Sequence, residues 1–263
     1  MRQVSLLICL LALSGCSGFG PLADHLPPEP EATGEPKTSG VRLTYLGTNG
    51  YLVETDAKRI LIDPYFSRIG FATAALNLPT APRTDRIDRY LAQLKIDRES
   101  LDLILITHGH FDHLMDVPHI VKKTGAPVLA SETSCHLLRA LGVPGRLTVP
   151  TRPGKKHEQG ALQVRTLTAS HDTICCGAVP FPGRLNKQPD PPRTPSHYVL
   201  GEPLAFTIRL AGKNIYIDSG GTPAVPPPAD LAPVDLAILG VALPDSRARL
   251  AEALSRLQPE VFL

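Results

Sequence analysis

The feature that most constrains this 263-residue sequence is a histidine-rich loop that directly follows an apolar segment. Residues 101–106 are apolar except for Asp102, which predicts a strand that is buried on both faces. The loop then reads Thr107-His108-Gly109-His110-Phe111-Asp112-His113. Binding and catalytic residues are common in loops that a rigid strand positions. We therefore expect a functional site at the end of this strand.

The spacing of the polar residues in this loop favours metal binding. His108 and His110 are two residues apart, so in an extended segment both imidazoles point the same way and can share one ion. Asp112 and His113 then turn toward a second position beside it. Neutral imidazole and carboxylate suit zinc and similar divalent ions. The alternative is a solvated histidine-rich turn, which three His and one Asp in so short a segment after a buried strand disfavour.

The N-terminal part of the chain resembles a bacterial lipoprotein signal. Arg2 precedes a short apolar run that is too short to span a bilayer, and the run ends in Leu13-Ser14-Gly15-Cys16. The resemblance implies a signal peptide at residues 1–15, cleavage before Cys16 and lipidation of Cys16. A plain secretory signal with an incidental Cys is the alternative. Ser17 beside the Cys favours an exported lipoprotein on the periplasmic side of the outer membrane.

The rest of the chain predicts a flexible tether followed by one domain. Residues 16–40 carry the Cys and are rich in Pro and Gly, which is typical of a tether. Residues 41–263 alternate between strand and helix patterns, with a long proline-rich loop at 177–203 and His157 in a polar turn. We expect strands at 41–46, 51–54, 59–62, 101–106, 127–130, 162–167, 204–210, 214–217 and 236–239, with another beginning at 260–263, and the strands at 204–210 and 214–217 should form a hairpin. We expect helices at 86–95, at 114–123 with Pro118 in the first turn, and at 132–141, and a final helix through 250–257 with Asp245 or Ser246 as its N-cap.

The histidine motif and the order of the segments around it resemble the metallo-beta-lactamase superfamily over residues 41–263. This resemblance implies an α/β fold, a four-layer αββα sandwich. It also implies two later metal ligands: His171, which follows the strand at 162–167, and Asp218, which closes the strand at 214–217. The first ion would be held by His108, His110, His171 and a bridging Asp218, and the second by Asp112, His113 and Asp218.

Members of the superfamily usually complete the second metal position with a His after a C-terminal strand. No His lies beyond His197 in this sequence, so we expect an apparently truncated C-terminal edge and a weakly held second ion. His197, in the proline-rich loop, is a candidate substitute ligand. The opening strands, from Tyr45 to Pro64, resemble the branch that contains ascorbate-phosphate lactonases and N-acyl-phosphatidylethanolamine phospholipase D.

These features predict a metal-dependent hydrolase. The expected cofactor is zinc, as one or two ions, with manganese or iron as alternatives. A metal-activated water would attack an ester, lactone or phosphodiester, and Asp112 would orient this water and accept its proton. The expected substrate is a small molecule or a lipid, and the formal net charge of +2 disfavours nucleic acid. An iron-dependent oxidoreductase of the same fold and a noncatalytic metal-binding lipoprotein are the alternatives.

Overall fold

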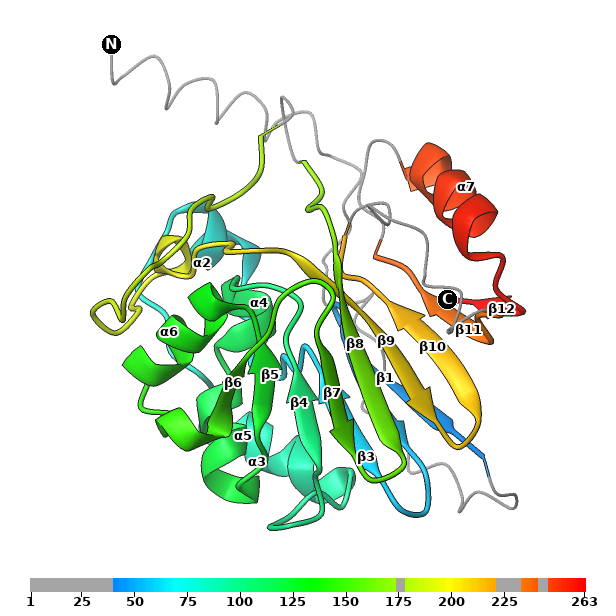
Figure 1. The fold of residues 1–263 in the computed structure, drawn as a ribbon. Helices are drawn as coiled ribbons and strands as arrows, with labels where there is room; N and C mark the ends of the chain where they lie inside the picture. Colours follow the sequence, from blue (N-terminus) through cyan, green and yellow to red (C-terminus); the bar gives the residue numbers. More distant parts are fainter. Residues whose placement is uncertain (1–39, 174–177, 221–232, 241–245) are drawn as a thin grey trace. The chain divides into compact units, whose positions relative to one another are not determined.

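The structure, a computed structural model, describes residues 40–173, 178–220, 233–240 and 246–263. These residues belong to one compact unit, Ala32–Leu263, in which two six-stranded sheets face each other and helices lie on the outer faces (Figure 1). The predicted four-layer αββα sandwich is therefore confirmed. The predicted signal peptide and nearly all of the tether, residues 1–39, lie outside the described residues. In the described ranges, no helix combines the length and the apolar character that a bilayer crossing requires.

The first sheet, sheet A, contains the strands from the N-terminal half of the domain in the order in which they occur in the sequence. Strands β1 to β3 are antiparallel, and β3 to β6 run parallel to one another. The six strands β1 to β6 are Arg42–Gly47, Gly50–Glu54, Arg59–Ile62, Leu103–Leu105, Val128–Ala130 and Thr148–Pro150.

The second sheet, sheet B, contains the later strands in the order β12-β11-β10-β9-β8-β7. Strands β9 and β10 form the predicted hairpin, and its two turn residues, Ala211 and Gly212, have positive φ angles, as tight hairpin turns require. The strands β7 to β12 are Lys156–Gln159, Leu162–Thr168, Leu204–Leu210, Lys213–Ile217, Leu236–Ile238 and Val261–Phe262.

Two of the helices have clear sequence signals at their ends. The predicted helix with Pro118 in its first turn is present, and it ends at Gly125 in the left-handed region. Ser131 caps the next helix by accepting a hydrogen bond from the backbone N–H of Ser134. The helices α2 to α7 are Phe71–Ala75, Thr84–Gln93, Phe111–Leu114, Val117–Thr124, Glu132–Ala140 and Ser246–Leu257, and the 3-10 helices η2 and η4 are Gly145–Leu147 and Pro195–His197.

Three apolar clusters separate the four layers. Along β4, Leu103 and Leu105 face the core between the sheets, whereas Ile104 faces α3, α5 and α6. Both faces of this strand are thus buried, which confirms the prediction from its apolar run. The strand that leads to the histidine-rich loop is therefore packed on both sides. The third cluster lies on the outer face of sheet B, where α7 packs through Ala253 and Leu257.

Two edge strands were not expected from the sequence. Strand β6 ends at Pro150, and β7 consists of Lys156, His157, Glu158 and Gln159. The prediction of a polar turn around His157 is wrong, because His157 pairs with Val164 of β8. Edge strands are often short, polar or proline-containing, and such strands lack the apolar alternation that predicts a strand.

Candidate metal centre

The site lies at one end of the sandwich, where strands of both sheets end. Asp63 follows β3 and Thr107 follows β4, and these two strands are parallel, so their carboxyl ends lie at the same edge. The backbone N–H of Leu204, at the start of β9, donates to the carbonyl oxygen of Thr107 at 2.8 Å and joins the two sheets at this edge. The loops after β8 and β10, which carry His171 and Asp218, reach the same edge because both strands are antiparallel to β9.

Three of the predicted ligands come together. The ligand atoms of His108, His110 and His171 all lie within 4.8 Å of one another. The His108 and His110 rings are nearly perpendicular, with their centroids 4.5 Å apart, and His171 lies 4.7 and 4.8 Å from them. His108 and His110 are 2% and 4% exposed. A residue distant in sequence thus joins the His-x-His pair, as expected.

The environment keeps these three imidazoles neutral. Burial, with the neighbouring histidines, lowers the pKa of His108 well below its ordinary value. Burial also lowers the pKa of His110 and of His171 to about 4, although the Asp112 carboxylate opposes this shift in both. Metal ions bind the neutral imidazole, so at neutral pH no proton competes for these three positions.

His113 has the opposite character because it faces carboxylates. Its ring lies 4.0 Å from that of His108, its Nδ1 is 2.9 Å from a carboxylate oxygen of Asp63, and its Nε2 is 3.6 Å from Asp112. Burial alone would lower the pKa of His113, but Asp63 and Asp112 raise it to about 9. With no metal bound, His113 is therefore a buried cation beside the three neutral imidazoles.

Asp63 is the functional residue that sequence reasoning did not single out. It is 1% exposed and accepts hydrogen bonds from the backbone N–H of Thr107 at 2.8 Å and from its hydroxyl at 2.6 Å, in addition to contacting His113. Its φ of 43° lies in the left-handed region, an unfavourable conformation that functional sites often tolerate. Its place directly after a strand, in Ile62-Asp63-Pro64, was the available signal.

Asp218 reaches the same edge, but its carboxylate is occupied by protein groups. One oxygen accepts from the backbone N–H of Gly240 at 3.0 Å and the other from the hydroxyl of Tyr216 at 3.1 Å. Burial raises the pKa of Asp218 to about 7, although these hydrogen bonds oppose the shift. Its neighbour Ser219 lies 3.4 Å from Nδ1 of His113. Asp218 is not part of the three-histidine group, so its bridging role stays a prediction.

Gly109 lies where no side chain fits. A Cβ at this position would collide with the carbonyl oxygen of Val199. The backbone N–H of Gly109 donates to the carbonyl oxygen of Leu200 at 2.9 Å. Residues 199–204, which we call the crossing segment, thus lie against the His-x-His loop.

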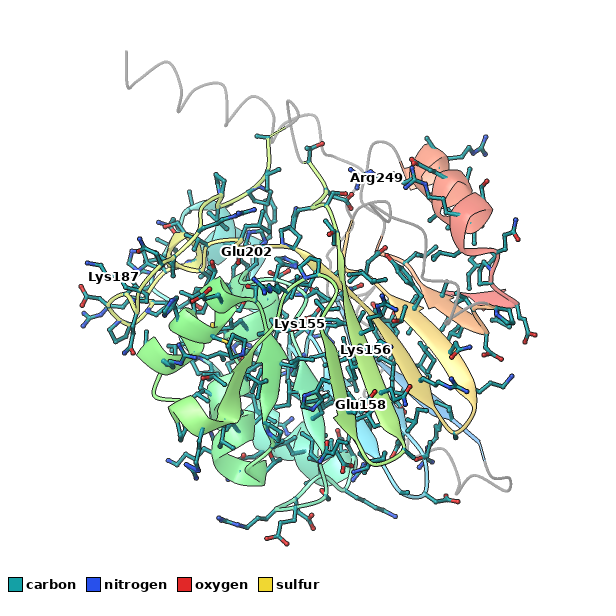
Figure 2. All side chains as sticks on the ribbon, in the orientation of Figure 1. Lys155, Lys156, Glu158, Lys187, Glu202 and Arg249 are labelled. Atoms are coloured by element: carbon teal, nitrogen blue, oxygen red, sulfur yellow. The ribbon has the colours of Figure 1, made fainter. Side chains whose placement is uncertain are left out.

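The other candidate ligand, His197, does not join the site. It is exposed at the end of η4, where its Nδ1 accepts a hydrogen bond from the backbone N–H of Arg193 at 3.2 Å. The loop that carries His171 is joined to α7 by an ion pair between Asp172 and Arg249. Arg249 is labelled in Figure 2. The positive charge of Arg249 contributes to the low pKa of His171.

The donor set fits a divalent ion. Three neutral, mostly buried imidazoles whose ligand atoms lie within 4.8 Å of one another match the protein part of a typical catalytic zinc site, which keeps one position open. Asp112, whose side chain is 30% exposed, lies beside them at the first turn of α4. The arrangement provides ligands, a nearby carboxylate and a buried cation, and this combination suits metal-assisted hydrolysis.

Two relatives of this chain are named as metal-dependent hydrolases. A UPF0173 metal-dependent hydrolase from Desulforamulus reducens is 27% identical over 203 residues, covering 76% of this chain and 72% of that protein. Another, from Carboxydothermus hydrogenoformans, is 27% identical over 204 residues with the same coverage. Both are proteins to which this chain is similar across most of its domain.

Solved structures and a family model agree on the fold. Igni18, a metallo hydrolase from Ignicoccus hospitalis, matches with a TM-score of 0.51 and 21% identity, covering 84% of this chain and 80% of its own. CmlA, a diiron beta-hydroxylase from Streptomyces venezuelae, matches with 0.52 and 18%, covering 87% and 45%. The sequence model of the metallo-beta-lactamase superfamily matches residues 43–177. This chain therefore belongs to the metallo-beta-lactamase superfamily.

Proposed function

We propose that this protein is a metal-dependent hydrolase that directs water onto an ester, a lactone or a phosphodiester. The observation that carries this proposal is the convergence of His108, His110 and His171 within 4.8 Å. The low pKa values of these histidines and the names of the relatives, metal-dependent hydrolases, support it.

The chemistry follows from the ligands and their neighbours. His108, His110 and His171 would hold a divalent ion, zinc first and manganese or iron as alternatives, and this ion would supply the Lewis acidity that makes water nucleophilic near neutral pH. Asp112 would orient this water and accept its proton, because its partly exposed carboxylate lies beside the histidines, 3.6 Å from Nε2 of His113. Asp63 positions the His108 loop through Thr107.

A second ion would use Asp112, His113 and Asp218. Binding there requires His113 to lose the proton that Asp63 and Asp112 stabilise. It also requires the Asp218 carboxylate to share its oxygens between the ion and the hydrogen bonds from Tyr216 and Gly240. Both changes cost free energy, so we propose that the second ion binds more weakly than the first.

We also propose that the mature protein begins at a lipidated Cys16 and works at the periplasmic surface of the outer membrane. The short apolar run and the Leu13-Ser14-Gly15-Cys16 ending support this location. A lipid or a small molecule near the membrane would then be the substrate. The resemblance of the opening strands to lactonases and N-acyl-phosphatidylethanolamine phospholipase D agrees with such substrates. Fractionation of cells that express Cys16→Ser tests the anchor, and an unchanged membrane-bound fraction would rule it out.

Metal analysis combined with a substrate panel tests the hydrolase proposal. The purified protein, loaded in turn with zinc, manganese and iron, is assayed on esters, lactones and phosphodiesters, with His171→Ala as the inactive control. Turnover of one class that His171→Ala abolishes would support the proposal. Iron-specific oxygen consumption would instead indicate the oxidoreductase alternative. Tight metal binding without turnover of any substrate would indicate a binding protein.

A further inference from the structure

The side of the sandwich that is formed by the edge strands β6 and β7 contains a cavity that is separate from the metal centre. It has a volume of about 540 Å³ and lies where the edge strands β6 and β7 of the two sheets face each other. None of His108, His110 and His171 lines it. Cavities of about 300–1,000 Å³ are typical of small-molecule sites. The size and position of this cavity make it a candidate for a second ligand.

The floor of the cavity is apolar because it opens onto the core between the sheets. Leu129 and Leu204, 2% and 1% exposed, belong to that core, and the half-buried Val149 packs against it. His157, whose strand partner Val164 faces the same core, stands at the rim. A ligand in this cavity would therefore contact hydrocarbon side chains with its inner part.

The rim of the cavity is mainly cationic. Arg152, Lys155 and Lys156 are exposed along the segment that leads from β6 into β7. Within the described part of the chain, neither Arg152 nor Lys155 has an ion-pair partner. Figure 2 labels Lys155 and Lys156 on this face.

Two carboxylates on the rim oppose this charge only in part. Glu202 is paired with Arg184 at 3.5 Å, which lies outside the cavity lining. Glu132 is the first residue of α6, where the helix dipole stabilises a negative charge. Arg152 and Lys155 therefore supply the positive charge that the rim offers to a ligand, and they outweigh Glu202, of which one carboxylate oxygen is paired with Arg184 and the other is buried without a hydrogen bond.

We propose that this cavity binds an amphipathic anion, a molecule with a hydrocarbon body and one anionic group. The hydrocarbon body would lie on Leu129, Val149 and Leu204, and the anionic group would face Arg152 and Lys155. The proposal does not depend on the hydrolase activity, because the cavity shares no residue with the metal centre.

Such a ligand would contact the crossing segment, which is hydrogen-bonded to the loop that carries His108 and His110. Leu200 and Leu204 are hydrogen-bonded to Gly109 and Thr107 at 2.9 and 2.8 Å, and Glu202, between them, lines the cavity. Gly201 lies close to the side chain of Thr133, so the segment has little room to shift. Occupancy of the cavity should therefore stabilise the segment that supports the His-x-His loop.

Titration calorimetry of the zinc-loaded protein with decanoate tests the proposal. Decanol, with the chain but no charge, and acetate, with the charge but no chain, are the comparison probes. We expect one decanoate per protein, with both comparison probes binding at least ~10-fold more weakly. The double variant Arg152→Glu/Lys155→Glu should weaken decanoate at least ~10-fold. The matched control Lys187→Glu, also exposed and apart from the cavity in Figure 2, should not.

A reporter locates the bound probe. The chain contains no Trp, so Pro153→Trp places a single fluorophore at the exposed wall of the cavity. A shift of its emission upon decanoate addition would support the site. Unchanged decanoate affinity in the double variant would overturn the proposal, because the carboxylate would then be binding elsewhere, the zinc included. Equal affinity for decanol and decanoate would overturn the assigned role of the charged rim.

Discussion

Replacing Asp63 with Asn should destabilise the metal-free protein by about 3 kcal/mol at about pH 6. The substitution keeps the shape of the side chain but removes the charge that faces His113 at 2.9 Å and accepts two hydrogen bonds from Thr107. Asp63 is 1% exposed, so water cannot replace the lost interactions. Removing one partner of a buried ion pair typically costs about 3–5 kcal/mol.

The pKa of His113 provides a second measure, in which Asp63 and Asp112 together outweigh the opposing effect of burial. It rises from 6.5 to about 9, and each unit corresponds to about 1.4 kcal/mol, which gives roughly 3 kcal/mol. Because the pKa is raised in the folded state, this stabilisation is complete below pH 6.5 and is lost as the pH rises through about 9. The cost of Asp63→Asn should therefore be smaller at about pH 10 than at about pH 6.

Urea unfolding of the metal-free protein at both pH values measures these costs. Asp88→Asn is the matched control, because Asp88 also contacts a histidine, His119 at 2.7 Å, and a lysine, Lys123 at 3.0 Å. Its side chain is 43% exposed, so its loss should cost less than about 1 kcal/mol. A loss below about 1 kcal/mol for Asp63→Asn, or an equal loss at both pH values, would refute the reasoning.

Three further predictions concern the metal and the reaction. His171→Ala should remove most of the bound metal by mass spectrometry, whereas His136→Ala, outside the cluster, should retain it; full retention in His171→Ala would mean that another residue is the third ligand. Asp112→Asn should lower kcat by about 10²-fold or more but shift Tm little, because its side chain is 30% exposed; a large fall in Tm would mark a structural role. Zinc affinity of the first site should change less than about 3-fold between about pH 6 and pH 7.5 in chelator competition, because the pKa of His110 lies at about 4; a steep loss at the lower pH would contradict that pKa.

Local patterns predicted most of the fold, because its core elements have strong periodicity. The apolar run at 101–106 contains β4, and the helix with Pro118 in its first turn is α5. The polar strand β7 was not predicted because its residues, Lys156–Gln159, show no apolar alternation. Its pairing with β8 depends on a tertiary arrangement that no short window of sequence contains.

The same limit applies to the site. His108 and His110 could be predicted because their spacing alone brings them together, and His171 because of its place in a known order of segments. The contacts of Asp63 depend on the parallel pairing of β3 with β4, which places its carboxylate beside Thr107. The orientation of the Asp218 carboxylate depends on a hydrogen bond from the backbone N–H of Gly240, which follows β11. Such contacts follow from topology rather than from residue spacing.

The crossing segment has a consequence for the order in which the protein folds. Its hydrogen bonds to Thr107 and Gly109 join parts of the chain that are far apart in sequence, and His171 must also arrive from a later strand. Contacts between distant segments form slowly because a long loop must close first. Before these contacts form, only His108 and His110 lie close together, and two ligands hold zinc less firmly than three. Zinc should therefore act mainly on the unfolding rate, by stabilising contacts that are completed after the transition state.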